Sequence, residues 1–167
     1  MGRKPHDRAR RLHALGDAEY RALGRFRRTV REFLAFSEGS AREQGLTPQQ
    51  HQALLAIRAH PRPQDMTVGE LADSLMIRNH TAVELVGRLV ERGFVARAGD
   101  PEDRRKVLLR LEPLGAAYLE RISSRNLQQL SETADILSEL LETFRHLQQR
   151  GEATVPAAPP ADPQGAK

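Results

Sequence analysis

Two stretches of the sequence concentrate arginine, whose planar guanidinium makes paired hydrogen bonds to phosphate groups and to guanine edges. Residues 1–31 contain ten basic and three acidic residues, and residues 78–110 contain eight basic and five acidic residues. The remaining segments are acidic or neutral, so these two blocks carry the positive net charge of +4. An arginine-rich composition by itself is equally expected of a solvated surface. The blocks therefore indicate nucleic-acid contact only if the fold presents them on a suitable element.

The second block begins within a pattern typical of two short helices joined by a tight turn. Thr67 and Glu70 have the spacing of a capping box, and apolar residues then recur on one face of a short helix. The polar run Asn79-His80-Thr81 offers capping groups to a following helix, which Gly93 ends. This arrangement predicts a helix-turn-helix.

After Gly93 the spacing of apolar residues changes from helical to extended. Residues 94–97 and 107–111 read as strands, joined by a turn-rich segment with a charged tip. A helix-turn-helix followed at once by such a hairpin is the order of a winged helix. The second helix of the pair is narrow enough to enter a major groove, and the hairpin tip reaches the phosphate backbone or an adjacent minor groove.

Helical spacing on both sides of this region predicts long flanking helices. Asp17 precedes an apolar stripe with steps of three and four residues. Thr47 and Pro48 supply an N-cap and a first helical residue for the next helix. The predicted fold class is therefore mainly α with a small β-hairpin wing. Beyond Pro113 helical spacing resumes, and a coiled-coil-like seam is formed by Leu127, Leu130, Ala134, Leu137, Leu141 and Phe144.

These patterns divide the chain into an arm, a central winged region with helices on both sides, and a tail. The winged helix-turn-helix region is predicted over residues 46–112, between helical segments at 17–45 and 113–149. A disordered tail rich in proline and alanine is predicted over residues 150–167. The basic arm, residues 1–16, has two open explanations, a DNA-contacting segment or a solubilising tail.

The segment from Leu46 to Gly115 resembles the MarR family of bacterial transcriptional regulators. Its wing motif, Asp-Pro-x-Asp-Arg-Arg, is the most diagnostic element of the resemblance. The matching residues are Leu46-Thr47-x-x-Gln50, Thr67-Val68-x-Glu70-Leu71-Ala72, Thr81-x-Val83-x-Leu85-Val86-x-x-Leu89-x-x-x-Gly93-Phe94-Val95-x-Arg97 and Asp100-Pro101-x-Asp103-Arg104-Arg105-Lys106-Val107.

The resemblance implies a homodimer that binds double-stranded DNA at a pseudo-palindromic operator, usually as a repressor released by a small aromatic or anionic ligand. It assigns dimerisation to residues 17–45 and 113–149, and a large unpartnered apolar surface on these helices would otherwise face water. It matches Asp103 and Arg105 to a wing pair in which the acid supports an arginine in the minor groove. The candidate DNA contacts are Arg78, Asn79, His80, Thr81, Glu84 and Arg88 on the recognition helix, and Asp103, Arg104, Arg105 and Lys106 on the wing.

Two positions of the recognition helix depart from the family pattern. Val83 stands where the family often has Ser or Thr, and Glu84 stands where it often has Arg. The Glu84 carboxylate has two open readings, because it can accept from cytosine N4 or form a solvated ion pair with Arg88 one turn later. The departures leave an alternative function, a helical dimeric protein-interaction module that has lost specific DNA binding.

The composition excludes several kinds of chemistry. The chain has no cysteine, which excludes disulfides, thiolate metal sites and a thiol-oxidation switch. Its six histidines are scattered without a His-x-x-x-His pair, so no metal site is expected. No phosphate loop or catalytic triad order stands out, so neither a cofactor nor an enzyme is expected. The sequence also has no apolar run of membrane-spanning length and no secretory signal, which predicts a cytoplasmic protein without membrane contact.

Overall fold

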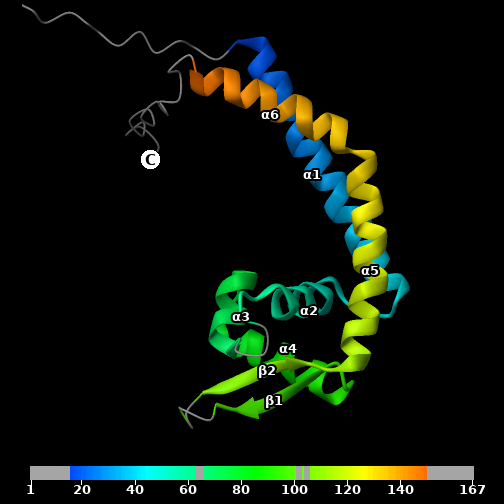
Figure 1. Ribbon diagram of the computed structural model, residues 1–167, viewed down its shortest axis with the longest axis vertical. Coiled ribbons are helices and arrows are strands. Elements are labelled where there is room, and N and C mark those ends of the chain that lie inside the picture. The colour runs from blue at the N-terminus through cyan, green and yellow to red at the C-terminus, as the bar shows by residue number, and fades with distance from the viewer. Residues whose placement is uncertain (1–15, 63–65, 101–102, 104–105, 150–167) are drawn as a thin grey trace, which may run out of the picture. The chain divides into compact units, whose positions relative to one another are not determined.

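The computed structural model describes residues 16–62, 66–100, 103 and 106–149, which are mainly helical (Figure 1). The predicted arm apart from Gly16 and the predicted tail therefore lie outside the described residues. The predicted fold class, mainly α with a small β-hairpin, is confirmed. The elements follow one another as α1 (Asp17–Glu43), α2 (Pro48–Ala59), α3 (Val68–Leu75), α4 (Asn79–Glu91), β1 (Val95–Gly99), β2 (Val107–Leu111), α5 (Pro113–Glu132) and α6 (Ala134–Gln149).

The described residues form two compact units. One spans Val30–Glu132 and contains α2 to α5 with the second part of α1. The other consists of the described parts of Met1–Thr29 and Thr133–Lys167, which are the first part of α1 and α6. No helix in these described ranges is both long enough and apolar enough to cross a membrane.

Capping boxes start both α2, for which the sequence predicts the N-cap Thr47, and α3, for which it predicts the box itself. Thr47 Oγ1 accepts from the Gln50 N–H at 3.2 Å, and the Gln50 side chain accepts from the Thr47 N–H at 2.9 Å. Thr67 and Glu70 make the same reciprocal pair, with distances of 3.2 and 2.7 Å. The hydrogen bonds from the Thr67 backbone and hydroxyl lower the pKa of the Glu70 carboxyl. Both helix starts are thus fixed by residues three positions apart.

The start of α4 differs from its prediction. Its N-cap is Arg78, which makes no side-chain capping hydrogen bond. An arginine side chain carries only donors, so it cannot accept from a backbone N–H. The polar run 79–81, expected to cap the helix, instead occupies its first turn. The prediction of side-chain capping at this helix is therefore wrong.

The end of α4 also sets the start of the hairpin. Gly93 follows the helix with a φ of +67°, as expected of the glycine that ends it. The Phe94 N–H then donates to the Leu89 carbonyl at 2.9 Å. Because Phe94 belongs to this helix end, β1 begins at Val95, one residue later than predicted.

The hairpin is attached to the helix-turn-helix through β2. β1 and β2 pair antiparallel over their full lengths. Thr67 forms an isolated antiparallel bridge with Leu108, and the Leu109 N–H donates to the Met66 carbonyl at 2.8 Å. The segment that leads into α3 therefore pairs with β2 and holds the wing.

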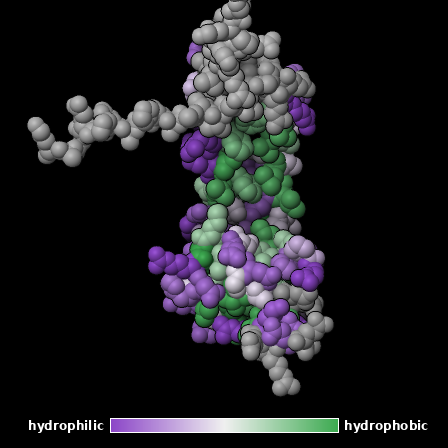
Figure 2. Space-filling model, turned by 90° about the vertical axis from the view of Figure 1, so that its left-hand side faces the viewer, coloured by the Kyte–Doolittle hydropathy of each residue, from purple (hydrophilic) through white to green (hydrophobic). Residues whose placement is uncertain are grey.

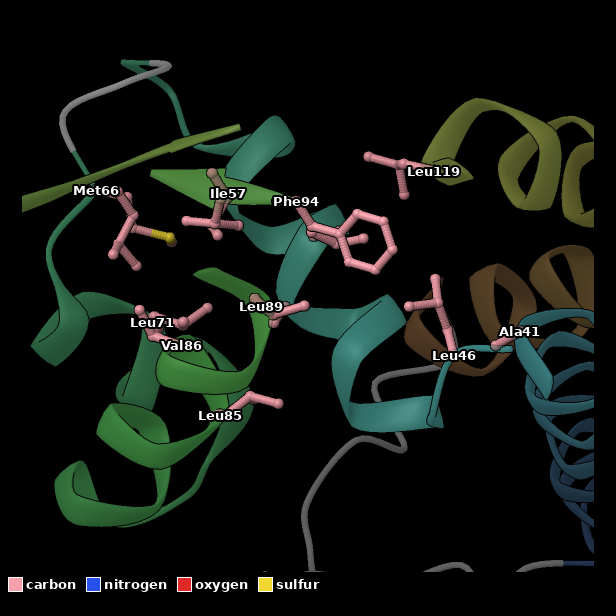
Figure 3. Close-up of a cluster of buried hydrophobic side chains, with 14 of the residues drawn as sticks. Ala41, Leu46, Ile57, Met66, Leu71, Leu85, Val86, Leu89, Phe94 and Leu119 are labelled. Atoms are coloured by element: carbon pink, nitrogen blue, oxygen red, sulfur yellow. The ribbon is translucent and has the colours of Figure 1, made fainter. Parts of the chain in front are cut away.

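One hydrophobic core holds the winged region together. The side chains of Ile57, Leu89 and Phe94, labelled in Figure 3, belong to one buried cluster although they come from α2, α4 and the residue just before β1. Gly115 lets α5 approach this core, because a Cβ there would lie only 2.3 Å from the Phe94 carbonyl oxygen. The largest fully buried apolar side chains are Leu54, Ile57, Leu71, Val86, Leu89, Val95, Leu109 and Ile122.

The C-terminal apolar series does not form one continuous helix. α5 ends at Glu132 and α6 begins at Ala134, so the predicted seam is interrupted. Just before the break, Ser131 Oγ donates to the Gln128 carbonyl at 2.7 Å. Serine and threonine hydroxyls compete for backbone groups in this way and weaken a helix locally. The spacing of apolar residues continues across the break, which is why the sequence pattern did not reveal it.

The first part of α1 packs against α6 through polar and aromatic contacts. The Arg25 guanidinium donates to both carboxylate oxygens of Glu139, each at 2.8 Å. The rings of Phe26 and Phe144 meet edge to face, with centroids 6.3 Å apart. Leu140 is buried in this unit. These contacts fix the pairing of α1 with α6.

Candidate nucleic-acid interface

Helix α4 separates an apolar face from a polar one. Its buried face consists of Ala82, Leu85, Val86 and Leu89, which lie in the core of the winged region. The core therefore fixes the rotation of the helix about its axis and decides which side chains reach solvent. Of the predicted contacts on this helix, Thr81 is half-buried, and those that are exposed are Arg78, Asn79, His80, Glu84 and Arg88.

The N-terminal end of α4 presents three consecutive exposed polar residues, Arg78, Asn79 and His80. No side chain in the described part of the chain caps this helix end. The first N–H groups of a helix lack partners within the helix, and the helix dipole makes its N-terminus attractive to anions. The arrangement can therefore accept a phosphate while the neighbouring side chains reach base edges.

The two charged residues in the middle of the polar face pair with each other. Arg88 Nη2 lies 3.6 Å from Glu84 Oε2, and both side chains are 66% exposed. This is the solvated ion pair that the sequence left as one of two readings. An exposed pair of this kind contributes about 1 kcal/mol or less, so either partner is available to a ligand at little cost.

The tip of the wing is described in part. The Lys106 N–H donates to the Asp103 carbonyl at 2.9 Å, and the Asp103 N–H donates to Asp100 Oδ1 at 3.3 Å. Lys106 is exposed and Asp103 is half-buried. The other two predicted wing contacts, Arg104 and Arg105, lie outside the described residues.

Arg97 joins the wing to the recognition helix and was not among the predicted contacts. It lies on β1, is exposed, and its Nη2 donates to the Val83 carbonyl at 3.4 Å. The signal that could have found it is its place in the run from Gly93 to Arg97, directly after the recognition helix. Its guanidinium is a further basic group beside the polar face of α4.

Arg92 holds the far end of α4 in place. Its Nη1 donates to the Gly45 carbonyl at 2.8 Å and to Gln50 Oε1 at 3.4 Å, so it links the C-terminal end of α4 to the turn before α2. The guanidinium also lies 4.5 Å from the centre of the Phe94 ring. Arg92 therefore helps to position the C-terminal end of α4 through contacts within the chain.

Other polar groups and cavities lie away from α4. His51 is buried, which lowers its pKa, and no described residue is a hydrogen-bond partner of its Nε2 atom. An open groove of about 470 Å³ lies between α2, β2 and α5 and is lined by Leu55, Arg58 and Leu119 among others. Within the described residues, no group of three or more His, Asp or Glu side chains is arranged to hold a metal ion.

Part of the chain matches a family of known proteins. Residues 44–106 match a family model described as the MarR family. The chain is 31% identical over 80 residues to the uncharacterized HTH-type transcriptional regulator YsmB of Bacillus subtilis, covering 48% of this chain and 50% of that protein. It is 28% identical over 117 residues to the transcriptional activatory protein BadR of Rhodopseudomonas palustris, covering 62% of this chain and 67% of that protein.

The fold of this chain is also similar to that of a solved structure. The structure of BpsR from Bordetella bronchiseptica superposes on this chain with a TM-score of 0.55. That structure concerns the regulation of the DNA binding of BpsR by 6-hydroxynicotinic acid. The two sequences are 26% identical, and the match covers 77% of this chain and 91% of that one. The similarity therefore includes the helices that flank the winged region.

Proposed function

Because the chain belongs to the MarR family of transcriptional regulators, we propose that it binds a pseudo-palindromic operator as a homodimer and represses transcription there. The relatives it matches are transcriptional regulators and not enzymes. The match to YsmB, the first of these relatives, spans 50% of the length of YsmB. The operator, the dimer, the sign of regulation and any effector are thus proposals for this chain.

The observation that carries the proposal is the polar face of α4. Its N-terminal residues Arg78, Asn79 and His80 are exposed, and the helix end is uncapped by any described side chain. In a helix-turn-helix this end of the second helix enters the major groove. We assign base-edge and phosphate contacts to these residues, with Thr81, Glu84 and Arg88 further along the helix.

The wing supplies the second contact in the proposal. Lys106 is exposed beside the hairpin tip, and Arg97 adds a guanidinium next to α4. Arg104 and Arg105 follow the Asp-Pro-x-Asp motif in the sequence and are assigned to the minor groove. Asp103 is assigned the role of supporting Arg105. Two separate contacts per subunit would fix both the depth and the rotation of α4 in the groove.

The dimer is supported by apolar side chains that the single chain leaves exposed. Figure 2 shows green hydrophobic residues at the surface of the helical part of the chain. A second copy would cover them, and two-fold symmetry would then place two recognition helices about 34 Å apart, one turn of DNA. The large exposed apolar side chains on α1, α5 and α6 are Tyr20 (61%), Leu23 (43%), Phe26 (37%), Leu34 (47%), Leu114 (49%), Leu127 (66%) and Leu141 (55%).

A small aromatic or anionic effector is proposed to release the DNA. The support is the ligand named for BpsR and the groove between α2, β2 and α5, whose walls combine leucines with the charged side chains of Arg58 and Glu120. The groove lies on elements that share a core with α4, so a bound molecule could alter the position of the recognition helix. Repression and not activation is our assignment, and a reporter gene placed behind the selected operator gives its sign directly.

The test of DNA binding starts from duplexes that the purified protein selects from a random-sequence pool. We expect a mobility shift with the selected duplex that weakens as salt rises, because each phosphate contact releases a counterion. Arg105→Ala should lower the affinity by about tenfold, as expected for the removal of one specific interaction, and flatten the salt dependence. Arg42→Ala, which removes an exposed arginine paired with Glu38 on α1, is the matched control and should change neither.

The protein-interaction alternative predicts the opposite result. If the wild-type chain enriches no sequence and shows no salt-sensitive shift, the regulator proposal is refuted. If it binds but Arg105→Ala behaves like Arg42→Ala, the wing contact is refuted while the helix contact stands.

A further inference from the structure

Met76 has an unusual backbone conformation. Among the non-glycine residues that the structure describes, it alone has a positive φ, 53°, with ψ at 41°. It is the C-cap of α3, where its N–H donates to the Asp73 carbonyl at 3.1 Å and the Ile77 N–H donates to the Ala72 carbonyl at 3.0 Å. This left-handed helix end favours glycine, because a Cβ is crowded there. Methionine therefore carries a conformational cost at this position.

The Met76 side chain makes no packing contribution that would offset this conformational cost. The Met76 side chain is 93% exposed, whereas Met66 is 4% exposed and lies in the core. A flexible apolar side chain so fully in water stabilises nothing within the chain. Residues held in rare conformations are concentrated at functional sites. A contact outside the chain would account for an exposed methionine at this position.

The location of Met76 indicates what that contact is. It lies in the turn of the helix-turn-helix, two residues before Arg78, the N-cap of α4. In the proposed function this helix end enters the major groove, where the apolar group that a base presents is the C5 methyl of thymine. We propose that Met76 contacts a thymine methyl group of the bound duplex and so helps to determine sequence specificity. The inference rests on the proposed function, since it needs α4 in the groove.

The exposed side chains on either side of Met76 are polar, which argues against an apolar protein interface. Asp73 and Ser74 precede Met76 and are exposed, and Arg78 and Asn79 follow it and are exposed. A protein interface needs a continuous surface with several apolar side chains. A single apolar side chain among polar ones suits one methyl group in an otherwise polar groove.

The test uses the full chain, its selected duplex, and the same duplex with deoxyuridine in place of thymidine, which removes only the C5 methyl groups. Wild type should bind the uracil duplex less tightly. Met76→Gly removes the side chain and the crowded Cβ, so its Tm should rise by about 2 to 4 °C. Its affinity for the thymine duplex should fall about fourfold for each methyl-sized group that the DNA no longer covers. For Met76→Gly, the ratio of the affinity for the thymine duplex to the affinity for the uracil duplex should be smaller than the wild-type ratio by the same factor.

Two further variants make the result specific. Met76→Gln keeps the length of the side chain but makes it polar, and it should lose affinity as Met76→Gly does. Leu55→Ala shortens another exposed apolar side chain, 44% exposed on α2 and outside α4, the wing and the proposed dimer helices, and with no effector present it should keep the wild-type ratio. The inference would be overturned if both Met76 variants kept the wild-type affinity for the thymine duplex, or if they kept the wild-type ratio of thymine-duplex to uracil-duplex affinity. In either case, binding by the wild-type protein would leave the proposed function intact. Failure of wild type to select or bind any duplex would refute both.

Discussion

Gly115 is the residue at which α5 approaches the winged core most closely. A Cβ at this position would lie 2.3 Å from the Phe94 carbonyl oxygen and 3.0 Å from Leu111 Cδ1. The carbonyl oxygen belongs to the backbone and accepts from the Glu112 N–H at 3.0 Å, so it cannot easily move aside. Hydrogen alone fits between α5 and the base of the hairpin.

Gly115→Ala should therefore destabilise the protein. Overpacking of this kind costs about 1 to 3 kcal/mol, and contact with backbone favours the upper part of that range. Gly87→Ala is the matched control, because nothing lies within 4 Å of a Cβ there and the residue is inside α4. That change should stabilise the helix by about 0.5 to 1 kcal/mol. Urea unfolding of both variants measures the difference, and equal free energies of unfolding would contradict the packing described.

Helices α2 and α3 show which features a sequence can predict and which it cannot. The starts at Thr47 and Thr67 were predicted, the first from an N-cap threonine followed by proline and the second from a capping box. The break between α5 and α6 was not, because the apolar spacing continues through Thr133. In each case the local hydrogen bonds, and not the apolar pattern, decide where the helix begins or ends.

The candidate site likewise has features that the sequence predicts and features that it does not. The polar face of α4 followed from the apolar residues that define its buried face. Three features depend on contacts distant in sequence or on backbone conformation, and no pattern announced them. These are the bond from Arg97 to the Val83 carbonyl, the bonds from Arg92 to the turn before α2, and the left-handed conformation of Met76.

Arg92 gives a prediction about the position of α4. Arg92→Met removes the bonds to Gly45 and Gln50 and the contact with the Phe94 ring, and should lower the free energy of unfolding by about 1 kcal/mol. Arg88→Met on the same helix removes only an exposed ion pair and should change it by about 0.5 kcal/mol or less. Guanidinium or urea unfolding distinguishes the two. If both variants lost equal stability, Arg92 would have no special role in holding the helix.

Helices α1, α5 and α6 form a helical framework that precedes and follows the winged region in the sequence. The net charge of +4 comes from residues 1–31 and 78–110, and the second of these blocks contains α4 and the wing. The exposed apolar side chains of α1, α5 and α6 are on the framework. In the proposed account the framework joins two copies, and each copy places one recognition helix on the same face of the duplex.

The spacing of the two half-sites tests this account most directly. The measurement is the affinity of wild-type protein for its selected duplex before and after about five base pairs, half a helical turn, are inserted at the centre. A two-fold dimer with fixed recognition helices can then engage one half-site only, so the affinity should fall by at least about tenfold. Equal affinity for both duplexes, or a selected sequence without two-fold symmetry, would contradict the account.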